Sequence, residues 1–345
     1  MRQAWIASIA SATLLTSLLA CSSATSGTGA TSSGRDGSTA PTVPSCQASG
    51  AGLSNCGAGE ESCCASAPVP GGAFILSYDG ISENGLSKGS TATVSDVTVD
   101  RYEVTVGRFR AFVAAEVAGW RPSAGTGKHS ELKGGGLNAG AETGWDASWT
   151  ANLATTTSGW AANLSCDPSY ATWTASAGSL EDHPINCVDW YEAYAFCIWD
   201  GGFLPSEAEW NYTASGGSEQ RLYPWSLAYP PGSDMLDCSL ANYSTSSTAC
   251  VMSGTNKVGS ESPMGDGRWG HSDMAGNVFE WVLDWSSTYP ASCDDCANLT
   301  PAQYRVIRGG GFDGSSACLL NSLRETSVPD GRSPSTGLRC ARPPT

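Results

Sequence analysis

The pattern of apolar and polar positions predicts a helix near the middle of the chain. Between residues 191 and 198, apolar side chains recur at intervals of three and four, which places them on one face of a helix. Asp189 and Glu192 match the capping box that starts such a helix, and two glycines at 201–202 end the pattern. We therefore expect a helix that begins after Asp189 and ends before residue 201.

Two further helices are predicted from their first residues. Ser206 and Glu209 form a second capping box, which opens a short helix at Glu207. Glu207 and Glu209 could also be an acid–base pair, but as carboxylates at a helix start they have a sufficient structural explanation. Thr105 can cap a helix whose inward-facing side chains are Phe109, Phe112 and Val113.

The apolar runs elsewhere predict short strands. Residues 73–78 follow a turn and have the composition of a strand, and residues 94–99 alternate like another strand. Residues 120–182 are rich in Gly, Ser, Thr and Trp, and the pattern places no element in them. The sequence thus indicates an irregular, loop-rich domain with an aromatic core.

The stretch 272–285, with the sequence SDMAGNVFEWVLDW, mixes carboxylates with large apolar side chains. Buried carboxylates are costly unless another group compensates their charge. A hard cation would do so through the side chains of Asp273 and Glu280 and the backbone carbonyls between them. The alternative is a strand whose carboxylates contact arginines, and the spacing of the residues leaves both explanations open.

The N-terminal residues indicate export. Residues 1–20 contain an apolar run of signal-peptide length that ends in Leu-Leu-Ala-Cys, which resembles the bacterial lipobox. In that interpretation Cys21 is lipidated, and residues 21–45, which are almost all small or polar, form a flexible tether. The lipid would anchor the protein to the membrane of the cell envelope, at the outer membrane or surface. The alternative is an ordinary cleaved signal with an incidental cysteine.

Charge and histidine spacing narrow the possible functions. The 345 residues carry a formal net charge of −15 and no basic run, which argues against nucleic acid as a partner. The three histidines, His129, His183 and His271, are far apart and lack the spacings typical of histidine metal sites.

The chain has fourteen cysteines, and in an oxidising compartment most of them should form disulfides. In the Cys-rich entrance segment 46–68, Cys63 and Cys64 are each expected to bond to Cys46 or Cys56, in an order left open. Further local pairs are expected for Cys166 with Cys187, Cys238 with Cys250, and Cys293 with Cys296.

Several ordered blocks resemble the formylglycine-generating enzyme family, also called the sulfatase-modifying-factor domain. The blocks are VDRYEVT at 99–105, HPI and VDW within 183–190, GFLPSEAEW at 202–210, YPW at 223–225, DMAGNVFEW at 273–281, RGGG at 308–311 and GLRC at 337–340. The resemblance covers residues 69–345 and implies one domain of complex α+β fold, related to C-type lectins and low in regular secondary structure. It also implies a disulfide between Cys197 and Cys340.

The resemblance further implies structural calcium (Ca2+). By similarity, Asp273 and Glu280 bind the ion through their side chains, and Gly276 and Val278 bind it through their carbonyls. A second calcium site of the family begins at Asn242, although the loop that carries its later acidic ligands is shorter in this chain.

The family's activity converts a cysteine in a sulfatase, a protein or peptide substrate, to formylglycine. It uses molecular oxygen and Cu+ held by two thiolates, the soft ligands that this ion prefers. Here Gly314 and Leu319 stand at the two cysteine positions, while Cys318 lies one residue away from the second. Phe279 also replaces a tryptophan beside the family's site. Cys318 is therefore the candidate catalytic thiol.

Two functions remain open at this point. One is formylglycine-type oxidation of a protein cysteine, with Cys318 as the surviving thiol. The other is a non-catalytic cell-surface module that holds a peptide or glycan in the same groove. In the first case Cys318 is reactive, whereas the structural alternative is a buried, inert cysteine.

Overall fold

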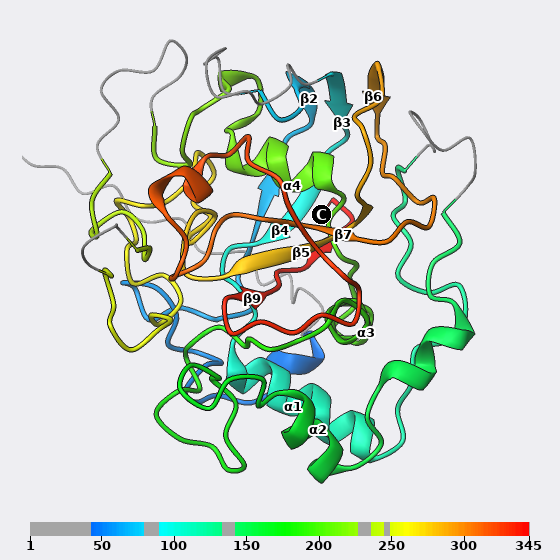
Figure 1. The fold of residues 1–345 in the computed structure, drawn as a ribbon, viewed down its shortest axis with the longest axis vertical. Helices are drawn as coiled ribbons and strands as arrows, with labels where there is room; N and C mark the ends of the chain where they lie inside the picture. Colours follow the sequence, from blue (N-terminus) through cyan, green and yellow to red (C-terminus); the bar gives the residue numbers. More distant parts are fainter. Residues whose placement is uncertain (1–42, 79–89, 133–141, 227–235, 245–248, 345) are drawn as a thin grey trace, which may run out of the picture. The chain divides into compact units, whose positions relative to one another are not determined.

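The strand β5 (Phe279–Trp285) lies in the middle of the protein, in a four-stranded sheet with the order β8-β7-β5-β9 (Figure 1). β7 (Arg305–Arg308) runs antiparallel to β5, and β8 (Glu325–Ser327) pairs with the other edge of β7. β9 (Thr336–Gly337) runs parallel to β5 on its free side. The sheet therefore joins four segments from the C-terminal part of the chain.

This computed structural model describes residues 43–78, 90–132, 142–226, 236–244 and 249–344. The predicted signal segment 1–20, the lipidation candidate Cys21 and most of the tether 21–45 lie outside the described residues. None of the helices in the described part of the chain combines the length and apolar character that a membrane crossing requires.

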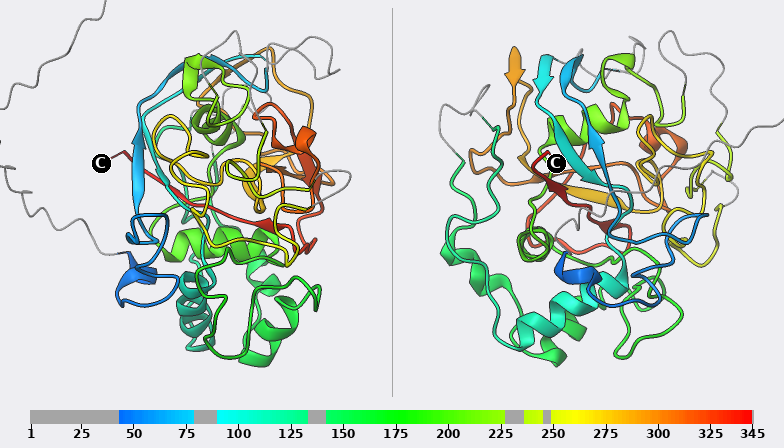
Figure 2. Two further views of the ribbon diagram at one scale, coloured as in Figure 1. Left: turned by 90° about the vertical axis from the view of Figure 1, so that its left-hand side faces the viewer. Right: turned by 180° about the vertical axis from the view of Figure 1, so that it is seen from behind.

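Two further sheets have three strands each (Figure 2). One has the order β1-β4-β10 and contains β1 (Ser66–Val69), β4 (Val97–Asp100) and β10 (Ala341–Arg342). The other has the order β2-β3-β6 and contains β2 (Gly72–Ile75), β3 (Thr91–Val94) and β6 (Ser292–Asp294). In the first sheet, a strand near the C-terminus pairs with one from the first third of the chain.

The three predicted helices are confirmed. α1 (Val106–Val117) is capped by Thr105, whose side chain accepts a hydrogen bond from the Arg108 N–H. α3 (Trp190–Trp199) and α4 (Glu207–Ala214) each begin with a complete capping box. The described residues also contain elements that the pattern did not predict, namely α2 (Thr157–Asn163) and the 3-10 helices η1 (Pro44–Cys46), η2 (Ala147–Asn152), η3 (Gly217–Glu219) and η4 (Ser316–Leu319).

Three strand predictions were wrong in their extent. The strand predicted at 73–78 ends at Ile75, the last residue of β2. Residues 94–99 do not form one strand, because Ser95 and Asp96 separate β3 from β4. The Ser95 N–H donates to the Asp295 carboxylate at 2.5 Å, and the Asp96 carboxylate accepts from the Gly71 N–H at 2.7 Å. In the stretch 272–285, only the part from Phe279 onward is a strand.

The helices pack around an aromatic core. Phe109 of α1 stacks on Phe196 of α3 with 5.5 Å between ring centroids, and Trp160 of α2 meets Phe109 edge-on at 5.9 Å. All three side chains are fully buried. Contacts of this kind contribute about 0.5–1.5 kcal/mol per pair beyond the burial of apolar area. These ring contacts explain how a domain with few helices has a well-packed interior.

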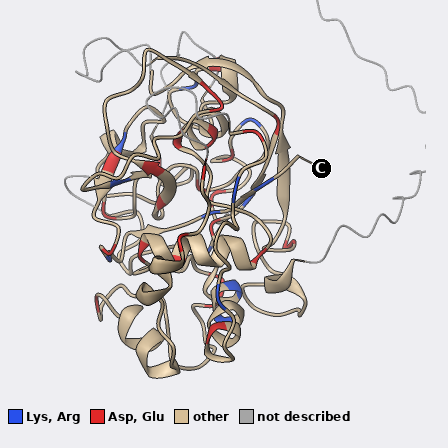
Figure 3. Cartoon of the chain, turned by 90° about the vertical axis from the view of Figure 1, so that its right-hand side faces the viewer, with Lys and Arg blue, Asp and Glu red and all other residues tan. Residues whose placement is uncertain are grey.

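The entrance segment and the C-terminal strand meet at a buried ion-pair cluster around Asp200. The Asp200 carboxylate accepts from the Ser45 N–H at 2.9 Å, from Arg108 at 2.7 Å and from Arg342 at 2.7 Å. Arg108 lies on α1, which carries both basic and acidic residues (Figure 3). Asp200 thus connects η1, α1 and β10.

Six disulfides are present in the described residues. In the entrance segment, Cys64 bonds to Cys46 and Cys63 bonds to Cys56, which is the connectivity that the sequence left open. The pairs are Cys46–Cys64, Cys56–Cys63, Cys166–Cys187, Cys197–Cys340, Cys238–Cys250 and Cys293–Cys296. The last four coincide with the pairs expected from local spacing and from the family resemblance.

Glu207 and Glu209 at the start of α4 do not face each other as an acid–base pair. Glu207 pairs with Arg324 and also contacts Arg308 at 3.0 Å. Glu209 contacts the Nε2 of His129 at 3.0 Å. Burial alone would lower the pKa of His129, but carboxylates on both sides of its ring outweigh burial and raise this pKa to about 10. Each glutamate therefore has a structural partner.

Candidate functional site

Cys318 lies in η4, just after the glycine block that follows β7. The block requires glycine at Gly310, which has a φ of +82° and where a Cβ atom would lie 2.8 Å from the Cys318 carbonyl oxygen. The Ser244 N–H donates a hydrogen bond to the Gly314 carbonyl at 2.9 Å. These contacts hold the Cys318 segment in place from both sides.

A second loop contacts the segment that carries Cys318. The Asn186 side-chain amide donates to the carbonyls of Tyr170 and Pro334, at 2.8 and 2.6 Å, and so ties two loops together. The Tyr170 ring is 39% exposed and lies 5.5 Å from the ring of Phe312, which is buried and belongs to the same segment as Cys318. We call the exposed Tyr170 ring together with the segment 312–318 the Cys318 face.

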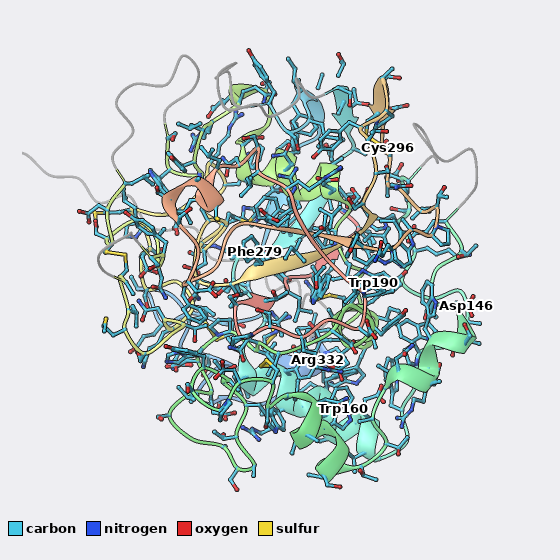
Figure 4. All side chains as sticks on the ribbon, in the orientation of Figure 1. Asp146, Trp160, Trp190, Phe279, Cys296 and Arg332 are labelled. Atoms are coloured by element: carbon cyan, nitrogen blue, oxygen red, sulfur yellow. A yellow bond between two sulfur atoms is a disulfide. The ribbon has the colours of Figure 1, made fainter. Side chains whose placement is uncertain are left out.

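The loop before β9 borders this face and is anchored to α3. Arg332 pairs with Asp189 at 2.8 Å and with Glu192 at 2.5 Å, so the capping box of α3 also fixes this loop. Phe279, labelled with Arg332 in Figure 4, begins β5, and its N–H donates to the Ser335 carbonyl at 2.7 Å. The Phe279 side chain is half-buried.

Cys318 is the free cysteine of the described residues, and its side chain is half-buried. Its Sγ lies 3.8 Å from the Ser315 Oγ. A Cβ atom at Gly314 would lie 3.2 Å from the Cys318 Cβ and 3.5 Å from its Sγ, whereas Leu319 is only 1% exposed and packs into an apolar cluster. The face therefore presents one thiol, and the neighbouring position 314 is a glycine, where an added Cβ atom would also lie 3.1 Å from the Gly311 carbonyl oxygen.

Glu280 is paired inside the protein. The Arg339 Nε lies 2.8 and 2.7 Å from its two carboxylate oxygens, and both side chains are buried. The Trp210 Nε1–H donates to Glu280 Oε2 at 2.6 Å. The other guanidinium N–H groups of Arg339 donate to backbone carbonyls, including that of Ser272 at 2.8 Å. For Glu280 the structure thus shows a carboxylate–arginine contact, one of the two explanations left open above.

Asp273 has a different environment. It lies in a turn with a φ of 58°, and its carboxylate accepts a hydrogen bond from the Gly259 N–H at 2.6 Å. The carboxyl groups of Asp273 and Glu261 also act on each other electrostatically. Burial raises the pKa of Asp273 well above its usual value, and the Glu261 carboxylate raises it further. Burial also raises the pKa of Glu103, and the charges of Asp273 and Glu280 add to that effect.

Asn242 is buried near this cluster. Its side-chain N–H groups donate to the Gly254 carbonyl at 3.0 Å and to the Asn277 Oδ1 at 3.3 Å, while its own Oδ1 has no hydrogen-bond partner among the described residues. Gly276 and Val278 flank Asn277 in the turn before β5. In the described part of the chain, no three or more His, Cys, Asp or Glu side chains form a group that could hold a metal.

Sequence reasoning missed three residues of this region: Arg339, Glu103 and Glu261. Arg339 and Glu103 belong to blocks that were recognised by resemblance, but the pairing of Arg339 with Glu280 spans 59 residues. Glu103 accepts hydrogen bonds from the Val278 N–H at 3.1 Å and from the Asn277 side chain at 2.6 Å. The position of Glu103 between Tyr102 and Val104 was the available signal for it, and Glu261 lies in no recognised motif.

Comparison with known proteins agrees with this architecture. The model of the "Sulfatase-modifying factor enzyme 1-like domain" family matches residues 57–344. A formylglycine-generating enzyme of Thermomonospora curvata is 30% identical over 301 residues, which cover 80% of this chain and 92% of that protein. An inactive C-alpha-formylglycine-generating enzyme 2 of Bos taurus is 31% identical over 173 residues, which cover 47% of this chain and 52% of that protein.

A solved structure shows the same fold. PvdO from Pseudomonas aeruginosa is 20% identical, with a TM-score of 0.54 over 81% of this chain and 94% of its own. The expected α+β fold of the formylglycine-generating enzymes and their C-type-lectin-like relatives is therefore confirmed, as is its low content of regular secondary structure. On the match over residues 57–344, this chain belongs to the sulfatase-modifying factor enzyme 1-like domain family.

Proposed function

We propose that this domain is a non-catalytic member of its family that holds a peptide segment of a partner protein on the Cys318 face. The observation that carries the proposal is the number of thiol groups on that face. Copper-dependent oxidation in the family needs two thiolates, and here one thiol, Cys318, stands beside a glycine, Gly314. A single thiolate does not provide the two soft ligands of the family's Cu+ site.

The remaining side chains of the face suit binding. Tyr170 presents part of its ring to solvent above Phe312, and the backbone around it is fixed by Asn186. A rigid, half-exposed aromatic ring provides contact area at little cost in conformational entropy, which is why tyrosine is enriched at binding hot spots. A relative that is named inactive also shows that family membership alone does not imply oxidation.

We also propose that the protein is exported and attached to the cell envelope through a lipid on Cys21. The lipobox-like sequence before Cys21 supports this attachment. The six disulfides of the described residues support an oxidising compartment, where such bonds form and persist. The face would then be displayed outside the cytoplasm.

Peptide binding can be tested with a display library of random twelve-residue peptides. We expect the wild-type protein to select peptides, and Tyr170→Ala to bind the selected peptides about tenfold more weakly, because the ring is a contact hot spot. Tyr304→Ala is the matched control, because Tyr304 is 40% exposed but lies before β7, outside the Cys318 face. Selection of no peptide, or equal losses in the two variants, would contradict this function.

The second candidate function is formylglycine-type oxidation, and the free, half-buried thiol of Cys318 is the observation that favours it. We expect the wild-type protein to bind Cu+ weakly against a chromogenic chelator and to consume no oxygen with a Cys-x-Pro-x-Arg peptide. Gly314→Cys should gain Cu+ binding by at least tenfold, because it places a second sulfur beside Cys318. Gly314→Ser is the control without sulfur. Tight Cu+ binding by the wild type that is lost in Cys318→Ser would restore the oxidase.

A further inference from the structure

We propose that a calcium ion binds between Asp273 and Glu261, and that Glu280, which is held by Arg339, is not one of its ligands. The family resemblance pointed to Asp273 and Glu280 as the two carboxylate ligands. The inference concerns which residues of this chain hold the ion, and it does not depend on the function of the Cys318 face.

Asp273 and Glu261 are two buried carboxyl groups that act on each other electrostatically. Asp273 is 7% exposed and Glu261 is 8% exposed. Within the described residues, neither carboxyl group forms an ion pair with a lysine, arginine or histidine, and the donors to them are the Gly259 N–H and the side chain of Asn256. The charge of Arg339 also reaches Asp273, but its guanidinium is bound to Glu280. Two buried carboxylates that lie close together require a compensating positive charge or a shared proton.

Two buried oxygen atoms in this region receive no hydrogen bond from any described residue. They are Glu261 Oε2 and Asn242 Oδ1, and Asn242 is 1% exposed. The two residues belong to one polar network, since Asn256 donates to Glu261 at 2.8 Å and both Asn256 and Asn242 donate to Asn277 Oδ1. An unpartnered buried oxygen is costly unless a cation or donor reaches it.

The oxygen atoms of this region suit calcium. Carboxylate, side-chain amide and backbone carbonyl oxygens are the ligands that calcium takes in flexible arrangements, whereas magnesium keeps several of its waters. Asp273, Glu261 and Asn242 supply the first two kinds. Glu280 supplies none, because Arg339 and Trp210 occupy both of its oxygens. Bound calcium would therefore neutralise Asp273 and Glu261 and leave the Glu280–Arg339 pair intact.

Thermal unfolding of the purified protein tests the inference. After treatment with EDTA and dialysis, addition of CaCl2 at a hundredfold excess over Kd should raise the melting temperature by about 5 °C. Glu261→Gln should remove this rise and weaken calcium binding by at least tenfold in calorimetry. In EDTA the same variant should melt no lower than the wild type, because the substitution relieves the repulsion with Asp273, so a failure to fold is not expected.

Glu280→Gln is the matched control. It should lower the melting temperature by a similar amount in EDTA and in CaCl2, because it breaks the pair with Arg339, and it should leave the rise caused by calcium unchanged. The inference is overturned if calcium does not stabilise the wild type, which would indicate a shared proton between Asp273 and Glu261. It is also overturned if the rise persists in Glu261→Gln and disappears in Glu280→Gln.

Discussion

A variant in which Cys197 and Cys340 are both replaced by alanine is expected to lose about 5 kcal/mol of unfolding free energy. The disulfide joins α3 to the residue before β10 and closes a loop with a sequence separation of 143. In the chain-entropy model, the cross-link stabilises the folded protein by restricting the unfolded chain, and the effect grows with loop length. Denaturant unfolding of the oxidised proteins measures the difference.

The Cys293–Cys296 disulfide provides the comparison for this experiment. Its two cysteines are buried like those of the long-range pair, but their sequence separation is 3. Replacing both with alanine should cost about 2 kcal/mol by the same relation. Equal losses for the two double variants would show that local packing, and not loop closure, determines the contribution of these bonds.

Replacing Arg339 with methionine is expected to lower the free energy of unfolding by about 3–5 kcal/mol. Methionine keeps most of the side-chain length but leaves the buried Glu280 carboxylate without its counter-charge. It also removes the donors to the backbone carbonyls of Asp100, Arg101 and Ser272. The loss should be measured by urea unfolding at neutral pH. In the variant, Glu280 must then be buried either as an unpaired charge or in its protonated form.

Lys257→Met is the matched control for Arg339→Met. Lys257 pairs with Asp182 at 2.8 Å, but its side chain is 61% exposed. Exposed pairs contribute about 0–1 kcal/mol, because water already solvates both charges. If the two variants lose similar amounts of stability, the Glu280–Arg339 pair does not have the role described here.

Local signals in the sequence were sufficient for the helices. The capping boxes at Asp189 and Ser206 and the cap at Thr105 are contacts between residues three apart, so they could be read without knowledge of the fold. The cysteine pairs that bracket single loops, such as Cys238 with Cys250, could be predicted for the same reason. The sequence was sufficient to predict a contact wherever its two partners lie close together in the chain.

Contacts between distant segments were not predictable in this way. The division of residues 94–99 into two strands depends on Asp295, which lies about two hundred residues later in the chain. The choice between cation and arginine at Glu280 depended on Arg339, and the partner of Asp273 was Glu261. Apolar spacing describes which face of an element is buried, but it does not identify which charged side chain lies opposite.

The pairing of β10 with β4 has a consequence for the synthesis of the protein. Ala341 of β10 lies opposite Val99 of β4, and Gly337 of β9 lies opposite Glu280 of β5. Pairing between segments so far apart in sequence is intrinsically slow, because the intervening chain must be ordered first. A nascent chain that has not yet emerged beyond Ser335 lacks a strand in two of the three sheets that the described residues form. The domain therefore completes these two sheets only after the segment that contains β9 and β10 has been synthesised.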